Sequence, residues 1–250
     1  MLIYDRVVPL NRHTHRRLRL RSAQHNARFA AELNSVPLTT VEFPHAASEY
    51  AIVFARLENG DFLPAVVVGL RNQQNLYVDE NARWKRGYVP AFLRQYPFML
   101  AEDRDSGTVT VCVDMAYDGL SEEEGDALFQ ENGDDSENLG RAMTFLQDLH
   151  GEFKRTAAFT ARLKELNLLD QQVIRFGGEG ETQRELGGVY VVSEERLLQL
   201  DDAVLPELLR SGAMGLIYTH LVSMRNLDRL SELAQQDAAN KSAAAASAVN

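Results

Sequence analysis

The sequence has few of the residues that tie a chain together or anchor it in a membrane. It contains one cysteine, Cys112, so the chain can form neither an internal disulfide nor a cysteine-based zinc cluster. No apolar run approaches the roughly 18 residues that a membrane-spanning helix needs. The apolar pieces near the amino terminus are short and are interrupted by Asp5 and Arg6, unlike those of a cleaved signal peptide. We therefore expect no membrane insertion and a cytoplasmic location, with export to the cell surface without a cleaved signal as the alternative.

The common catalytic and phosphate-binding motifs are also missing. The sequence has no P-loop, no Gly-x-Ser-x-Gly elbow and no His-Glu-x-x-His. The glycine-rich stretch 177–180 contains Glu179, whose charge would repel a phosphate. His13 and His15 would lie on one face of a strand, as metal ligands can, but flanking arginines would repel a cation. We predict no catalytic residue, no metal site and no cofactor, which favours a protein that is not an enzyme.

Charge is plentiful but unevenly distributed. The formal net charge is −10, yet residues 1–28 carry seven arginines against one acid, whereas residues 101–138 carry thirteen acids against one arginine. Two interpretations stay open: solvated surfaces, or complementary surfaces that meet within the chain or on a neighbouring copy. If the surfaces are complementary, we expect a protein partner or self-association. Nucleic-acid binding through the arginine-rich end is disfavoured by the overall acidity and by the lack of an accompanying fold motif.

The hydrophobic pattern predicts an α+β fold in which strands come first and helices later. Two β-rich runs, 52–57 and 62–70, flank Asn59-Gly60 and indicate a hairpin, because both of those residues tolerate the positive φ of a type I′ turn. With a third strand at 76–78 they predict an antiparallel meander in the N-terminal half. Apolar residues then recur every three to four positions from residue 139 to about residue 167, which predicts a long amphipathic helix before a helical C-terminal part.

The same pattern predicts one domain followed by a tail. We expect a single domain over residues 1–236, with a strand-rich part at 1–116, an acidic connector at 117–138 and a helix-rich part at 139–236 that ends in one helix from Met214 to Leu233. Residues 237–250 are rich in alanine and have no periodic apolar face, so we expect a disordered tail there.

Candidate ligand-binding residues come from two places. The stretch 63–100 holds the only tryptophan, and its cations stand beside aromatic rings, a combination that can bind an acidic or aromatic ligand by stacking and bidentate pairing. A core aromatic cluster with charge at its rim is the alternative. On the last predicted helix a histidine lies on an apolar face, where a hydrogen-bonded core histidine is the alternative. The candidates are Arg83, Trp84, Tyr88, Arg94, Tyr218 and His220.

The chain resembles the bacterial SapC family over residues 3–233. The segments that carry the resemblance are Val8–Asn11 with His15, Asn75–Asp79, Trp84, Tyr88–Ala91, Tyr96–Phe98, Gly188–Tyr190 and Gly215–Leu221 with Ser223. The resemblance implies an association with a paracrystalline surface layer and no established catalytic residues. Family members are often encoded near TonB-dependent receptors and near halogenase-like or cupin-like proteins.

Two hypotheses follow from the residues and the resemblance together. The first is a non-catalytic surface-layer or envelope-associated accessory protein that acts through protein contacts. The alternative is a ligand-binding or enzymatic accessory protein, linked to nutrient uptake or peptide modification, with a pocket near Trp84 and His220.

Overall fold

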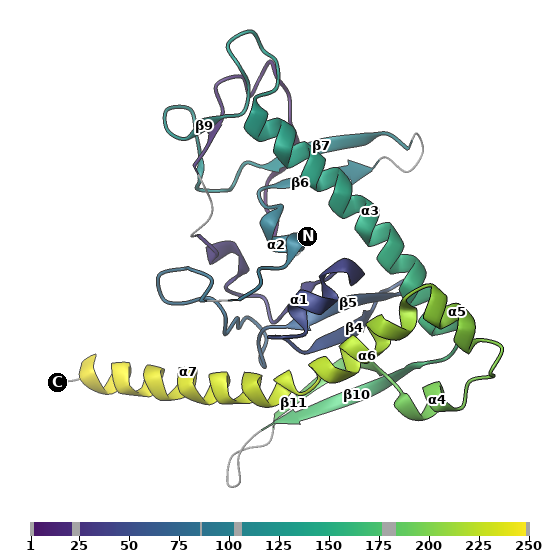
Figure 1. Cartoon of the computed structure of the whole chain (residues 1–250). Helices are drawn as coiled ribbons and strands as arrows, with labels where there is room; N and C mark the ends of the chain where they lie inside the picture. The colour runs from purple at the N-terminus through teal and green to yellow at the C-terminus, as the bar shows by residue number, and fades with distance from the viewer. Residues whose placement is uncertain (1–2, 22–25, 86, 103–106, 177–183, 249–250) are drawn as a thin grey trace.

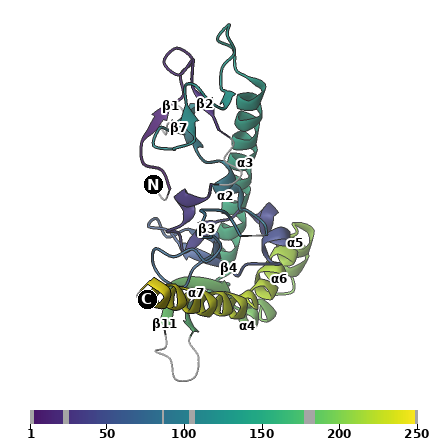
Figure 2. The ribbon, with the colours of Figure 1, turned by 90° about the vertical axis from the view of Figure 1, so that its left-hand side faces the viewer.

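The computed structural model describes residues 3–21, 26–85, 87–102, 107–176 and 184–248, and it is an α+β fold, as the sequence predicts. One long helix, α3 (Glu137–Glu165), runs along the molecule and joins a smaller part at its amino-terminal end to a larger part at its carboxyl end (Figures 1 and 2). Ser136 caps α3, because its hydroxyl accepts a hydrogen bond from the Leu139 N–H. Each part has its own apolar core, and both cores use residues of α3.

The larger part is built on a five-stranded antiparallel sheet. Its strands, in spatial order, are β10 (Leu169–Phe176), β11 (Arg184–Val192), β4 (Ile52–Arg56), β5 (Phe62–Val67) and β3 (Ser35–Pro37). The predicted hairpin is confirmed, with β4 and β5 paired across a turn in which Gly60 has a φ of +81°.

The predicted third strand of the meander is wrong. Residues 76–78 form no strand, and Val78 makes only an isolated bridge to Trp84. The reason lies in the tertiary structure, because the open edge of β5 is already paired with β3. Asn75 holds the segment in a loop instead: its side-chain amide donates to the Ala30 carbonyl, and its side-chain oxygen accepts from the Tyr77 N–H.

The smaller part contains two three-stranded sheets. One has β7 (Val109–Asp114) between β1 (Val7–Pro9) and β6 (Phe98–Glu102). The other has β2 (Arg19–Leu20) between β8 (Leu120–Ser121) and β9 (Asp126–Ala127). In both sheets a strand of the arginine-rich segment therefore pairs with strands of the acidic segment.

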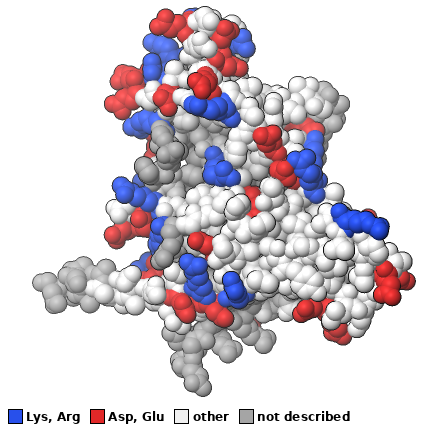
Figure 3. All heavy atoms as spheres, in the orientation of Figure 1, with Lys and Arg blue, Asp and Glu red and all other residues white. Residues whose placement is uncertain are grey.

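Ion pairs join the same two segments. Arg17 lies 2.8 Å from Glu122, and Arg21 lies 3.8 Å from Glu124. Acidic and basic side chains accordingly alternate over this end of the molecule (Figure 3). Exposed pairs of this kind add little stability, so strand pairing and not charge holds the segments together. The two segments therefore lie side by side within the chain, while their charged side chains stay largely exposed to solvent.

Asp114 is a fully buried carboxylate at the base of the smaller part. It accepts hydrogen bonds from the backbone N–H groups of Asp5, Arg6 and Ala116 and from the Tyr96 hydroxyl. Burial by itself raises its pKa, but these hydrogen bonds outweigh burial and bring the pKa below its ordinary value. Asp114 therefore acts as a charged anchor for the amino-terminal segment and is not an acid–base group.

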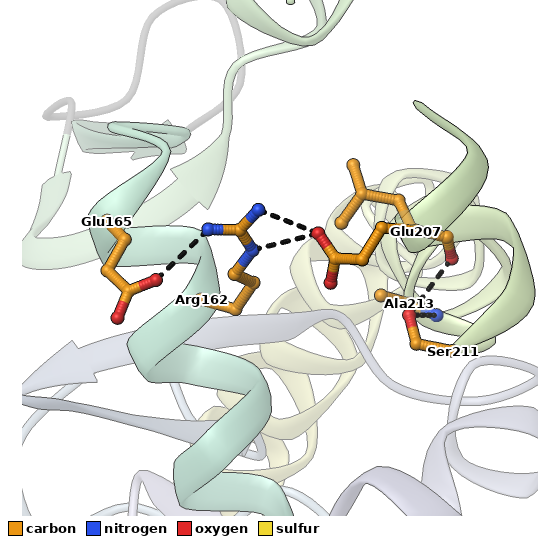
Figure 4. A network of polar contacts seen from close by, with 6 residues as sticks. Arg162, Glu165, Glu207, Ser211 and Ala213 are labelled. Atoms are coloured by element: carbon orange, nitrogen blue, oxygen red, sulfur yellow. Dashed lines mark hydrogen bonds and ion pairs between the residues drawn. The ribbon is translucent and has the colours of Figure 1, made fainter. Parts of the chain in front are cut away.

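The remaining helices are short except for the last. They are η1 (Arg28–Ala30), η2 (Thr40–Glu42), α1 (Phe43–Ala46), α2 (Ala91–Arg94), α4 (Glu194–Leu198), α5 (Leu205–Arg210), α6 (Ala213–Ser223) and α7 (Asn226–Ala248). Arg162 near the end of α3 holds α5 in place. Its guanidinium donates to Glu207 from Nε (3.1 Å) and Nη2 (2.7 Å), and to Glu165 from Nη1 at 3.1 Å (Figure 4).

The carboxyl-terminal region differs from the prediction in two ways. The single helix expected over residues 214–233 is divided into α6 and α7, and α7 continues to Ala248, where the sequence predicts a disordered tail from residue 237. Residues 226–248 contain neither proline nor glycine, and alanine has the highest helix propensity of all residues. Lys241 also pairs with Asp237 one turn earlier, at 2.8 Å. In the described part of the chain, no helix combines the length and the apolar character needed to cross a bilayer.

Candidate functional site

A cavity of about 540 Å³ lies between α2 and the amino-terminal half of α3. Its walls are mainly apolar and aromatic and come from separate regions of the chain. They include Leu20 from β2, Phe29 from η1, Trp84 from the loop after Val78, Leu93 from α2, Phe98 from β6, and Phe145 and Leu146 from α3. We call it the Trp84 cavity. Its volume is in the range of roughly 300–1,000 Å³ that is typical of small-molecule sites.

Arg94 supplies a positive charge at the wall of the Trp84 cavity. Its Nε donates to the Val89 carbonyl and its Nη2 donates to the Tyr88 hydroxyl, both at 3.1 Å. The guanidinium carbon lies 5.1 Å from the ring centre of Phe145 and 5.7 Å from that of Tyr88. These partners among the described residues are all neutral, so they orient the guanidinium without neutralising its charge.

Glu42 holds the Tyr88 hydroxyl from behind. The Glu42 carboxylate is buried and accepts from the Tyr88 hydroxyl at 2.9 Å and from the Ala91 N–H at 2.7 Å. Its other oxygen accepts from the N–H and the hydroxyl of Thr39, at 2.9 and 2.7 Å. This capping box at η2 thereby also fixes the start of α2 and, through Tyr88, the position of Arg94.

The pKa of Tyr88 keeps its hydroxyl protonated. Burial is the main cause, the negative charge of Glu42 adds to it, and together they raise the pKa of Tyr88 to about 12. At neutral pH the hydroxyl can therefore donate to Glu42 and accept from Arg94 at the same time. The chain from Glu42 through Tyr88 to Arg94 is a positioning device for one cation.

Arg141 is the second cation at the Trp84 cavity. It stands on the first turns of α3 and pairs with Glu137 at 3.0 Å, with both side chains largely exposed. Because such a pair is worth little, the Arg141 side chain can turn toward a ligand at small expense. The cavity thus combines a ligand-sized apolar interior with two guanidinium groups, of which Arg94 is the more firmly held.

The structure separates the six predicted site residues into those at the cavity and those elsewhere. Trp84 and Arg94 line the Trp84 cavity, and Tyr88 supports Arg94. Arg83 is exposed, and its backbone closes a turn with Asp79. Tyr218 stands on the outer face of α6 with 42% of its surface exposed.

His220 is a core residue and not part of the Trp84 cavity. It is fully buried, its Nδ1 lies 2.8 Å from the Ile52 carbonyl, and its Nε2 accepts from the Val192 N–H at 3.0 Å. The second contact requires the Nδ1-protonated tautomer, which then donates to Ile52. Burial lowers the pKa of His220 to about 4. The imidazole is therefore neutral at pH 7 and ties α6 to β4 and β11.

The other candidates for chemistry take structural positions. His13 and His15 lie in an exposed turn and not on a strand, and His15 Nδ1 accepts from the Asn11 N–H. Cys112 is buried on β7, and burial raises the pKa of its thiol. Over the described ranges, no three His, Cys, Asp or Glu side chains are grouped so that they could hold a metal ion. The glycine-rich stretch 177–180 lies outside the described residues.

Sequence reasoning missed the contributions of η1 and α3 to the Trp84 cavity. Phe29 lies in a segment without a clear pattern, and Phe145 falls outside the apolar face that predicts α3. One signal was available in the sequence. Phe145 lies next to the apolar face of the amphipathic helix and widens it, so the helix has more apolar surface than packing against a single neighbouring element would bury. The extra width of α3 is used by the cavity.

Fold and cavity together define an α+β protein with a ligand-sized apolar cavity and a cationic wall. The family model described as SapC matches residues 10–230, so the chain belongs to the SapC family. No curated protein and no solved structure matched the chain, and the comparisons therefore identify the family without an activity.

Proposed function

We propose that this SapC-family protein is a non-catalytic binding protein whose ligand is an organic anion with an apolar body, held in the Trp84 cavity. The observation that carries the proposal is the orientation of Arg94 by neutral partners at a mainly apolar wall. A guanidinium in that setting favours a carboxylate or sulfonate, because it can form two charge-assisted hydrogen bonds with such a group. The aromatic walls would cover the apolar body of the ligand.

The protein-contact hypothesis has less support. Its motives were the uneven charge and the absence of the common catalytic motifs. The first is weaker now, because the arginine-rich and acidic segments pair with each other within the chain. A role in surface-layer or envelope biology, and a link to nutrient uptake or peptide modification, stay predictions that rest on the family resemblance. The cytoplasmic location also stays a prediction.

The test uses Trp84, the only tryptophan of the chain, as the reporter. Anilinonaphthalenesulfonate is an aromatic anion, and phenylnaphthylamine is its neutral counterpart without the sulfonate. We expect both probes to quench Trp84 emission by energy transfer. The Arg94→Gln substitution should weaken binding of the anionic probe about tenfold, because it removes a charge-assisted contact, and should change binding of the neutral probe less than twofold.

Arg155→Gln is the matched control. Arg155 stands on the same helix as Arg141 and forms a comparable exposed pair with Glu152, but it does not line the Trp84 cavity. Affinity for both probes should be unchanged in this variant. Equal losses for the anionic and the neutral probe in Arg94→Gln, or no response of Trp84 emission to either probe, would rule out the proposed site.

A further inference from the structure

A second cavity, of about 390 Å³, lies on the other side of α2. It is lined by Phe92, Met99, Leu149, His150 and Phe153, among others. Two side chains, Gln95 and Leu146, line both this cavity and the Trp84 cavity. The cavities are therefore neighbours that share a wall made of side chains.

The inner face of α3 is continuous across both cavities. Arg141 and Phe145 line the Trp84 cavity, Leu146 lines both, and Leu149 and Phe153 line the second one. Arg141, Phe145, Leu149 and Phe153 follow each other at four-residue steps of one helix face, and Leu146 lies three residues before Leu149. From Arg141 to Phe153 the helix rises about 18 Å, at roughly 1.5 Å per residue. The two cavities thus lie end to end along α3, separated by the side chains of Leu146 and Gln95, and we call the pair the α3 trough.

We propose that this α3 trough binds one linear-chain carboxylate, with the carboxylate at Arg94 and Arg141 and the hydrocarbon chain passing between Leu146 and Gln95 into the second cavity. The inference rests on the proposed function and specifies its ligand class. Leu146 is the gate residue in this arrangement: it is an apolar, buried side chain in the shared wall, and the ligand requires it to adopt another rotamer.

The charges at the two ends of the trough set the direction of the ligand. At the far end, the Glu102 carboxylate lies 3.4 Å from His150 Nε2 and 3.7 Å from Lys154 Nζ. His150 Nε2 is buried and has no hydrogen-bond partner among the described residues. Lys154 already pairs with Glu102, so the charges at this end largely cancel and a carboxylate would gain little there. At the near end, the direct hydrogen-bond partners of Arg94 are neutral, so an incoming carboxylate does not have to displace an acidic side chain from the guanidinium.

The decisive measurement places a heavy atom on the ligand and reads Trp84 emission in the unmodified protein. Hexadecanoate with bromine beside the carboxylate should quench Trp84, because the head of the ligand lies next to it. Hexadecanoate with bromine on the terminal carbon should change Trp84 emission by less than about 10% relative to unbrominated hexadecanoate, because the tail lies in the second cavity. Equal quenching by the two isomers would show a chain folded back into the Trp84 cavity and would overturn the inference.

A variant gives an independent test. Met99 lines only the second cavity, and Met99→Phe should partly fill it. We expect affinity for hexadecanoate, measured by displacement of anilinonaphthalenesulfonate, to fall at least tenfold, and affinity for octanoate to stay within twofold. Met214→Phe, on α6 and away from both cavities, controls for the added ring.

The outcomes separate this inference from the proposed function. If octanoate binds and depends on Arg94, while Met99→Phe weakens octanoate and hexadecanoate alike or neither of them, the proposed site stands and the trough does not. If neither octanoate nor the anionic probe binds, the proposed function itself fails.

Discussion

Replacement of His220 by alanine is expected to lower the free energy of unfolding by about 3–5 kcal/mol. The imidazole satisfies two buried backbone groups at once, the Ile52 carbonyl and the Val192 N–H, and it packs with its ring centre 5.0 Å from that of Phe54. Alanine would leave both backbone groups without a partner and would open a cavity between α6 and the sheet. Urea denaturation followed by circular dichroism measures the loss.

Tyr218→Ala is the control for this substitution. Tyr218 lies on the same helix, but its side chain is exposed on the opposite face, so we expect a loss below about 1 kcal/mol. If His220→Ala were no more destabilising than Tyr218→Ala, the bridging role of the imidazole would be wrong.

His220 also predicts a dependence of stability on pH. Its pKa is about 4 in the folded protein and ordinarily 6.5, because burial disfavours the charged form. Below about pH 6.5 the unfolded chain binds a proton that the folded chain does not bind until about pH 4. The contribution of this group is therefore complete above pH 6.5 and is lost as the pH falls through 4, with a total on the order of 3 kcal/mol.

A comparison with His220→Gln isolates this contribution from that of the many carboxylates. The difference in unfolding free energy between the two proteins, measured in urea at several values between pH 7 and pH 4, should shrink as the pH falls. A difference that stays constant over this range would contradict a neutral, buried imidazole.

Replacement of Glu42 by alanine is the second prediction with a large effect, and we expect a loss of about 3–5 kcal/mol. The buried carboxylate accepts four hydrogen bonds, two from Thr39, one from Tyr88 and one from the Ala91 N–H. Alanine would leave the backbone donors of Thr39 and Ala91 without acceptors and would release the start of α2. Since Tyr88 would also lose its support, affinity of the folded variant for anilinonaphthalenesulfonate should fall several-fold.

Tyr88→Phe separates the two effects of Glu42→Ala. It removes only the hydroxyl between Glu42 and Arg94, so we expect about 1 kcal/mol of lost stability and the same loss of anion affinity. Glu58→Ala, at the exposed turn between β4 and β5, should change neither. An unchanged affinity in Tyr88→Phe would show that Arg94 needs no support from this chain of contacts.

Local patterns account for the elements that sequence reasoning placed correctly. The hairpin of β4 and β5 is encoded by Asn59-Gly60 between two β-rich runs, and α3 by a repeat that holds over about eight turns. The failures at residues 76–78 and 237–248 have separate causes. At residues 76–78 the composition favours a strand, but composition does not reveal that the edge of β5 is already paired with β3. At residues 237–248 the lack of an apolar face predicts disorder, but alanine-rich sequence favours a helix even without such a face.

The sequence by itself determined the α+β class and the family, and it showed that the common catalytic motifs are missing. Each of these depends only on composition or on the spacing of residues along the chain. It also brought forward Trp84 and Arg94 as neighbours of potential interest. Only the tertiary structure decided that these two share a cavity while His220 belongs to the core. The physical reason is that the cavity walls come from η1, α2, β6 and α3, whose meeting depends on long-range packing and leaves no local pattern.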